Sequence, residues 1–401
     1  MGGTWLRRLG LERRVGALAA GLFVYGFGQE LWFRYLPEYL RVLGASAFTV
    51  GAFGALKDLL DAAYAYPGGV VSDRLGSRDA LLLFGLLSVA GFGLYLAWSS
   101  VPALFAGLVL VMAWPALGLP ATFALVGEEL RGGRRIVGFT VQAVLKRIPI
   151  VLAPPVGGLL IERLGMRNGL RAGFAASVVL AAGMLVVLRR AFREDARASR
   201  PRPTGPAPAV RLHRSLKRLL VADCLVRLCE GLPDVFLVIW ALEIVRVSPV
   251  QFGLLTSVLM GTAILSYLPA AALAGRAEKK KFVVLTYLFF TLFPVAVVLS
   301  RSFAALVLAY VVGGLREIGE PARKALIVDL AEPLQRGRTV GLYYSIRGFA
   351  VAGAAAIGGA LWTVRPELTF AVAAGLGALG TLFAAVFLPS SSPAPLAEAT
   401  P

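Results

Sequence analysis

The stretch GVVSDRLGSR, residues 69–78, places one aspartate and two arginines between two long apolar runs. The chain of 401 residues is 58% hydrophobic and only 16% charged, whereas about a quarter of the residues in a soluble domain are charged. Apolar windows of about 20 residues, the length of a helix that crosses a bilayer, recur along the whole chain. The sequence therefore predicts an all-α, polytopic membrane protein, with residues 69–78 in a short loop between two spans.

Hydropathy and the positions of charged, Gly and Pro clusters predict twelve spans in two bundles. Their approximate ranges are 14–40, 47–72, 79–98, 101–127, 136–162, 168–189, 217–244, 250–274, 282–300, 302–330, 338–363 and 367–388. The predicted domains are an N-terminal six-helix bundle (1–190), a basic Pro-rich cytoplasmic linker (191–215), a C-terminal six-helix bundle (216–389) and a disordered tail (390–401).

The basic residues predict the orientation of the chain. With both termini in the cytoplasm, cytoplasmic segments carry 25 of the 41 Lys and Arg residues, and the opposite loops carry 7. This bias follows the positive-inside rule, so we expect a multi-pass protein of the cell membrane with cytoplasmic termini. The same distribution argues against nucleic-acid binding, because the cations line one membrane face instead of forming a folded patch.

An internal repeat relates the two predicted bundles. A shift of about 201 residues brings PATFALVGEEL (120–130) onto PARKALIVDLA (321–331). The same shift brings Lys146 onto Arg347 and Gly157 onto Gly358. Parallel repeats of this kind form a solute site at their interface, near the membrane midplane.

The stretch of residues 69–78 is similar to the signature sequence of a known family. GVVSDRLGSR resembles the G-x-x-x-D-R-x-G-(R/K)-(R/K) signature of the major facilitator superfamily (MFS), in the loop where that signature occurs. Ser77 departs from it at one basic position. The matching residues, which form the predicted gating motif, are Gly69, Asp73, Arg74, Gly76 and Arg78. The resemblance covers the whole chain and implies the twelve-helix MFS fold.

The resemblance also implies a role for the motif. Gly69 would permit close helix approach, and Gly76 would allow a tight turn. Asp73 would engage the start of the eleventh span near Arg338 and hold a cytoplasmic gate shut. The alternative is a solvated turn whose arginines only set the orientation.

A second element, PIVLAPPVGGLL in the fifth span, is similar to the G-x-x-x-G-P-x-x-G-G element of facilitator antiporters. It slightly favours efflux, although helix packing by Pro154, Gly157 and Gly158 explains it almost as well. The arginine motif that such antiporters carry in the fourth span is absent from WPALGLPATFALVG. Simple drug–proton antiport is therefore disfavoured.

Ionisable side chains at membrane depth must face partners or water. Residues three or four apart share a helix face, so helical spacing predicts pairs. The expected pairs and coupling residues are Glu30 with Arg34; Lys57 with Asp61, leaving Asp58; Arg227 with Glu230 and Asp234; and Arg316 with Glu320, near Glu317, Arg323 and Lys324.

Nine deep cations against seven deep carboxylates leave an expected excess of +2. We therefore expect a polar, anionic solute, because Arg binds carboxylate or phosphate bidentately. The expected solute-binding residues are Lys146, Arg147, Arg347, Arg323 and Arg34. The alternative is a set of interhelical salt bridges that never touch the solute.

The sequence thus predicts a secondary active transporter that is slightly favoured to export and is driven by a proton gradient, with Asp58, Asp61, Glu230 and Asp234 as candidate proton carriers. Two alternatives are a multidrug/proton antiporter and a non-transporting sensor of the same fold. The sequence holds no HExxH, nucleophile elbow or Walker loop, so we expect no enzyme, metal site or cofactor. The expected partners are a small-molecule solute and the lipid bilayer, with the monomer as the functional unit.

Overall fold

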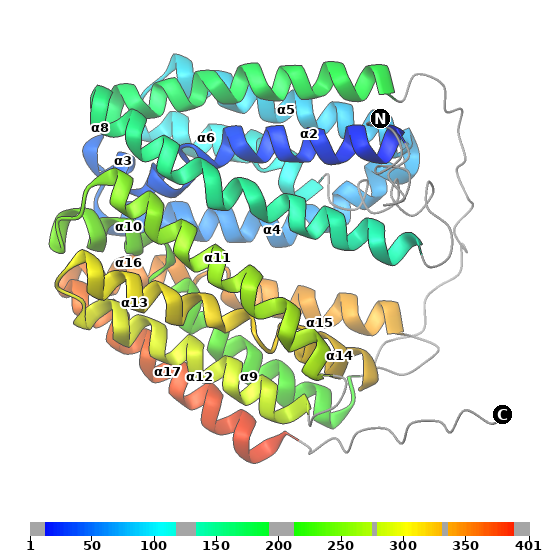
Figure 1. Ribbon diagram of the computed structural model, residues 1–401, viewed down its shortest axis with the longest axis vertical. Coiled ribbons are helices and arrows are strands. Elements are labelled where there is room, and N and C mark those ends of the chain that lie inside the picture. Colours follow the sequence, from blue (N-terminus) through cyan, green and yellow to red (C-terminus); the bar gives the residue numbers. More distant parts are fainter. Residues whose placement is uncertain (1–12, 118–133, 192–211, 275–278, 331–335, 389–401) are drawn as a thin grey trace. The chain divides into compact units, whose positions relative to one another are not determined.

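The computed structural model describes residues 13–117, 134–191, 212–274, 279–330 and 336–388 (Figure 1). Every regular element in these ranges is a helix, which confirms the predicted all-α fold. Most of the predicted linker (191–215) and nearly the whole stretch after the last helix, including the predicted tail (390–401), lie outside the described residues.

Where the structure describes them, the helices of the first half begin and end within a few residues of the predicted spans; the predicted end of the fourth span, at 127, lies outside the described residues. They are α2 (Arg13–Glu30), the 3-10 helix η1 (Phe33–Tyr35), α3 (Leu36–Val42), α4 (Ala47–Leu75), α5 (Ser77–Ala97), α6 (Val101–Val111), the π-helix η2 (Ala113–Leu117) and α8 (Arg134–Ala191). The element α8 contains two predicted spans. Gly165, with φ 77°, interrupts its helical backbone and divides the two. Glycine adopts this positive φ without steric cost.

The second half follows the same order. Its helices are α9 (Arg214–Gly231), η3 (Asp234–Phe236), α10 (Leu237–Ile239), η4 (Trp240–Ile244), α11 (Pro249–Ala274), α12 (Lys279–Leu299), α13 (Phe303–Gly314), η5 (Leu315–Glu317), α14 (Glu320–Asp329), α15 (Arg336–Val351), α16 (Ala354–Val364) and α17 (Pro366–Phe387). Among the described residues, six helical stretches are long and apolar enough to cross a membrane.

The chain divides into two compact units. The first contains Met1–Pro206 and Val235–Ser257, and the second contains Ala207–Asp234 and Val258–Pro401. Residues 235–257 of the second half thus pack with the first unit. There the Tyr35 hydroxyl lies 2.7 Å from the Pro154 carbonyl oxygen and 2.8 Å from that of Pro249. The predicted domain boundaries stay a prediction.

Each unit contains the same close backbone contact. A Cβ on Gly157 would overlap the carbonyl oxygen of Leu31, and a Cβ on Gly358 would overlap the carbonyl oxygen of Leu232. Both residues of the second contact lie 201 positions after those of the first. The 3-10 helices η1 and η3, which follow α2 and α9, are 201 residues apart as well. The repeat seen in the sequence therefore recurs as a repeat of packing.

The first unit has an aromatic core. Trp32 is 1% exposed, and its indole Nε1 donates to the Ser177 hydroxyl at 2.8 Å. The rings of Phe92, Tyr95 and Phe174 lie with centroids 5.0–5.8 Å from the Trp32 ring. Edge-to-face contacts at this separation add to the free energy of burial, so Trp32 fixes the break between α2 and α3.

We predict that Gly157→Ala destabilises the protein, because the added methyl group has no room beside the Leu31 carbonyl. Overpacking of this kind costs about 1–3 kcal/mol, and thermal unfolding of the purified protein in detergent measures the loss. The matched control is Gly183→Ala in the same helix, where an added Cβ meets no described atom within 4 Å. Equal melting temperatures for the two variants would contradict the close-contact role of Gly157.

Candidate functional site

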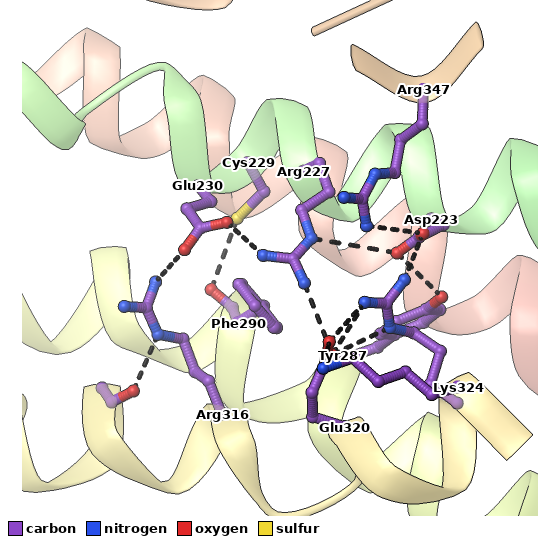
Figure 2. A network of polar contacts seen from close by, with 12 residues as sticks. Asp223, Arg227, Cys229, Glu230, Tyr287, Phe290, Arg316, Glu320, Lys324 and Arg347 are labelled. Atoms are coloured by element: carbon purple, nitrogen blue, oxygen red, sulfur yellow. Dashed lines mark hydrogen bonds and ion pairs between the residues drawn. The ribbon is translucent and has the colours of Figure 1, made fainter. Parts of the chain in front are cut away.

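A connected network of ion pairs lies in the second unit (Figure 2). Its charged residues come from α9, η5, α14 and α15, and α12 adds a tyrosine. The network members are Asp223, Arg227, Glu230, Arg316, Glu320, Arg323, Lys324 and Arg347. Five cations face three carboxylates, so the network carries a net charge of +2 when all members are ionised.

Asp223 is the centre of this network, with its side chain only 1% exposed. Its Oδ2 accepts hydrogen bonds from Arg323 Nη1 at 2.6 Å, from the Tyr343 hydroxyl at 3.0 Å and from Arg347 Nη1 at 3.3 Å. The Tyr287 hydroxyl donates to Oδ1 at 3.4 Å. A buried carboxylate needs such donors, because leaving it unpaired is strongly unfavourable.

Arg323 is fully occupied by carboxylates. Its Nη2 lies 2.7 and 2.8 Å from the two oxygens of Glu320, its Nε donates to Glu320 Oε2 at 2.9 Å, and its Nη1 donates to Asp223. The residue is 1% exposed. The forked guanidinium thus joins α14 to α9, as a bidentate arginine can.

The other end of the network is built around Glu230. Arg227 Nη1 donates to one of its oxygens at 2.7 Å, and Arg316 Nη1 lies 3.4 Å from the other. Both guanidinium carbons also lie over the Phe290 ring, at 5.0 and 4.9 Å from its centroid. Arg227 Nη2 lies 3.6 Å from Glu320 and so connects the two ends of the network.

A helix break positions Arg316 and Glu320. The helix α13 ends at Gly314, and Arg316 Nε donates to the Gly313 carbonyl at 2.7 Å within η5. The Gly319 N–H donates to the Thr286 hydroxyl at 2.7 Å, just before α14 begins. Glu320 is the first residue of α14, where the helix dipole favours a negative charge.

The structure corrects two predicted pairs. Arg316 contacts Glu230 on another helix, whereas Glu320 is bound by Arg323 and Lys324. The predicted Arg316–Glu320 pair is therefore wrong. Arg316 lies in the 3-10 turn η5, so it does not share a helix face with Glu320 as it would in a continuous α-helix. In the first unit Lys57 lies 3.2 Å from Asp58, so Asp58 is not left over as predicted.

The remaining predicted charges are placed as follows. Arg34 Nε lies 3.1 Å from Glu30, its predicted partner, and Arg227 contacts Glu230, also as predicted. Asp61 and Asp234 are exposed, and Glu317 and Arg147 are half-buried. The side chain of Lys146 lies outside the described residues.

Asp223 was missed by the sequence analysis, and it changes the charge count. Adding it to the deep carboxylates lowers the predicted excess from +2 to +1. It lies four residues before Arg227, and the two side chains are 3.9 Å apart. The four-residue spacing that predicted other pairs therefore also predicts the pair of Asp223 and Arg227.

Arg347 is the network arginine with the most unused donors. Its side chain is 20% exposed, and its Nη1 contacts Asp223. Within the described residues its Nε and Nη2 form no hydrogen bond, and its Cζ lies 4.6 Å from the centre of the Tyr344 ring. This arginine can accept an oxyanion without losing an existing bidentate pair.

The signature stretch 69–78, predicted as a loop, is helical except at Gly76, since α4 ends at Leu75 and α5 begins at Ser77. Gly76 has φ 85°, which allows the turn between α4 and α5, and its N–H donates to the Ser72 carbonyl. A Cβ on Gly69 would meet no described atom within 4 Å, whereas one on Gly68 would overlap Leu117. Among the described residues, the close approach predicted for Gly69 is therefore made by Gly68.

The charged residues of this loop are less fully described. Arg74 is exposed, and Arg78 lies 3.9 Å from Asp79. The side chains of Asp73 and Arg338 lie outside the described residues, so their predicted contact does too.

The helices and the buried charges define a membrane transporter fold, and comparison with known proteins agrees. The Major Facilitator Superfamily profile matches residues 18–228 and 219–400. The chain belongs to the Major Facilitator Superfamily. It is an MFS-type membrane transporter, a class that moves small-molecule solutes and is not enzymatic.

Similar proteins support this assignment. An uncharacterized MFS-type transporter of Methanocaldococcus jannaschii is 21% identical over 90% of this chain and 91% of its own length. A peptide transporter POT solved in complex with sulfate has a TM-score of 0.76 at 19% identity, with 94% of each chain covered. The human organic anion transporter MFSD10 has a TM-score of 0.64 at 18% identity, covering 93% of this chain and 99% of its own. At these identities the structures show the shared fold.

We predict that Arg323→Gln strongly destabilises the protein, because Asp223 and Glu320 would lose the cation between them. Removing one partner of a buried ion pair costs about 3–5 kcal/mol. The neighbouring Lys324→Gln is the matched control, because its side chain is 54% exposed and such a pair contributes less than about 1 kcal/mol. Thermal unfolding in detergent compares the two, and equal losses would contradict the central role of Arg323.

Proposed function

We propose that this transporter moves a small oxyanionic solute across the cell membrane by alternating access. In this mechanism the two pseudo-symmetric halves rock around a site near the membrane midplane. The proposal concerns the charge of the solute, the residue that binds it, the source of energy, and the orientation and oligomeric state of the protein.

The observation that carries the proposal is the charge of the buried network. Apart from the exposed Lys324, four arginines and three carboxylates lie together in the second unit and leave a net charge of +1. A net positive charge in a low-dielectric region is unfavourable unless an anion compensates it. A solute that carries a negative charge would neutralise the network and would be attracted to it.

Arg347 is the proposed solute-binding residue of the second unit. Its partial exposure and unused nitrogens fit a carboxylate, phosphate or sulfate, each of which can accept two parallel hydrogen bonds. Arg323 was a candidate as well, but its pairing with Asp223 and Glu320 favours a structural role. Lys146, Arg147 and Arg34 stay candidates on the first unit.

Two fold neighbours support an anionic solute. One is a peptide transporter solved in complex with sulfate, and the other is described as an organic anion transporter. The shared fold therefore accommodates anions, and the chemistry of the second unit favours one here.

We predict that Arg347→Gln lowers anion uptake by reconstituted liposomes at least tenfold, because the solute loses its main cation. The substrates tested are radiolabelled sulfate, phosphate and mono-, di- and tricarboxylates. Lys324→Gln, which removes an exposed cation of the same network, is the control and should keep most of the activity.

Three outcomes would contradict this proposal. Transport by the Arg347→Gln variant at the rate of the unaltered protein would remove Arg347 from the site. Transport of cationic drugs alone would favour the multidrug antiporter. Binding of solutes without any flux would favour a sensor.

We further propose that protons drive transport and that Asp61 carries them. Asp61 is exposed on α4, three residues after Asp58, which Lys57 already neutralises. The two carboxylates share one helix face, and Asp61 is the one that we propose to take up and release the proton.

We predict that Asp61→Asn abolishes the stimulation of uptake by an imposed pH gradient while it preserves counterflow exchange of the solute. Exchange requires the binding site but no net proton movement. Asp79→Asn, at the start of α5, is the control and should retain the stimulation. If transport by the unaltered protein ignores the pH gradient, proton coupling is refuted.

The orientation and oligomeric state are also part of the proposal. We infer that both termini are cytoplasmic, from the bias of Lys and Arg residues, and that the monomer transports. Export remains the favoured direction, and flux measured in vesicles of defined orientation tests it.

A further inference from the structure

We propose that Asp223 is an internal competitor of the solute: it occupies Arg347 in the unliganded transporter and releases it to an incoming oxyanion. This inference rests on the proposed anion site. It assigns a positioning role to a carboxylate that sets the affinity and the chemical selectivity of that site.

The contact between Asp223 and Arg347 is the one that can break. It is 3.3 Å long and uses a single guanidinium nitrogen, whereas Arg323 contacts the same carboxylate oxygen at 2.6 Å. When Arg347 leaves, Asp223 keeps its bonds to Arg323, Tyr343 and Tyr287. The buried carboxylate therefore retains its hydrogen-bond donors, and its release of Arg347 carries little desolvation penalty.

Arg347 is positioned to exchange Asp223 for an oxyanion. Its guanidinium lies over the Tyr344 ring, which holds it by a cation–π contact whichever anion it binds. An oxyanion can engage two nitrogens in parallel, which the single contact with Asp223 does not do. A solute with two oxygens on one centre can thus displace Asp223.

This exchange predicts the selectivity of the site. Carboxylates, phosphates and sulfate offer two oxygens to the guanidinium fork, whereas chloride offers one atom. We therefore expect sulfate to bind and chloride to compete weakly. A halide, which offers a single atom, should therefore not displace Asp223 from Arg347.

The exchange also connects binding to conformation within the second unit. The Asp223–Arg347 contact joins α9 to α15, and Figure 2 shows the two side chains meeting from these different helices. A bound oxyanion removes this ion pair and leaves the hydrogen bond from Tyr343 as the remaining polar contact to α15 that Asp223 makes among the described residues. Solute binding would thereby loosen one of the attachments that fix α15.

The test measures sulfate binding to the full-length protein in detergent by isothermal titration calorimetry, at constant ionic strength. Asp223→Asn should lower the Kd for sulfate at least fivefold, because the competing charge is gone. Tyr343→Phe should raise the Kd two- to fivefold, because Asp223 loses a donor and holds Arg347 more tightly. Tyr25→Phe removes a buried hydroxyl of the first unit and should leave the Kd unchanged.

The outcomes separate this inference from the proposed function. If sulfate binds the unaltered protein and Arg347→Gln abolishes binding, the anion site stands. If Asp223→Asn then leaves the Kd unchanged or raises it, the competitor role is overturned. If Asp223→Asn does not fold, an unchanged Kd in Tyr343→Phe overturns it instead.

Two further results are informative. Absence of sulfate binding to the unaltered protein would overturn the anion site and the competitor together. Restoration of the original Kd by Asp223→Glu, which returns the charge, would support competition by charge over a purely structural role.

Discussion

A fully buried carboxylate in a membrane protein must find its hydrogen-bond donors within the protein, because the acyl chains supply none. Asp223 meets this constraint with donors from three other helices, namely α12, α14 and α15. One side chain thus holds four helices of the second unit together. Arg323, Tyr343 and Arg347 supply the donors that satisfy that carboxylate.

The two units build the same backbone contacts with different chemistry. Gly157 and Gly358 each lie against a carbonyl at the break that follows the first helix of their half, so the close contact is repeated. The first unit fills the region beside its break with the Trp32 aromatic cluster, which is held by dispersion and burial. The second unit contains the ion network centred on Asp223 in α9. The two units therefore share a backbone contact, while the largest ion network among the described residues lies in the second unit.

Hydropathy predicted the spans well, because the need to bury about 20 apolar residues determines where a helix enters and leaves the bilayer. The breaks inside spans were not predictable in this way. Arg316 was assigned to Glu320 by helical spacing, but η5 turns it toward Glu230. Helical spacing offered one contact of Asp223, with Arg227, but its shorter contacts with Arg323, Tyr343 and Arg347 lie on other helices. Which side chains meet across different helices can be predicted only when the fold is known.

The predominance of arginine in the network has a physical reason. A lysine presents one charged point, whereas a guanidinium presents nitrogens in several directions and can bridge helices. Arg227 contacts Asp223, Glu230 and Glu320 at once, and Arg323 contacts two carboxylates. Any one of these contacts can therefore break while the remaining ones keep each buried charge compensated. A transporter that moves its helices during each cycle needs this property, because a buried pair with a single contact would leave two uncompensated charges whenever it opened.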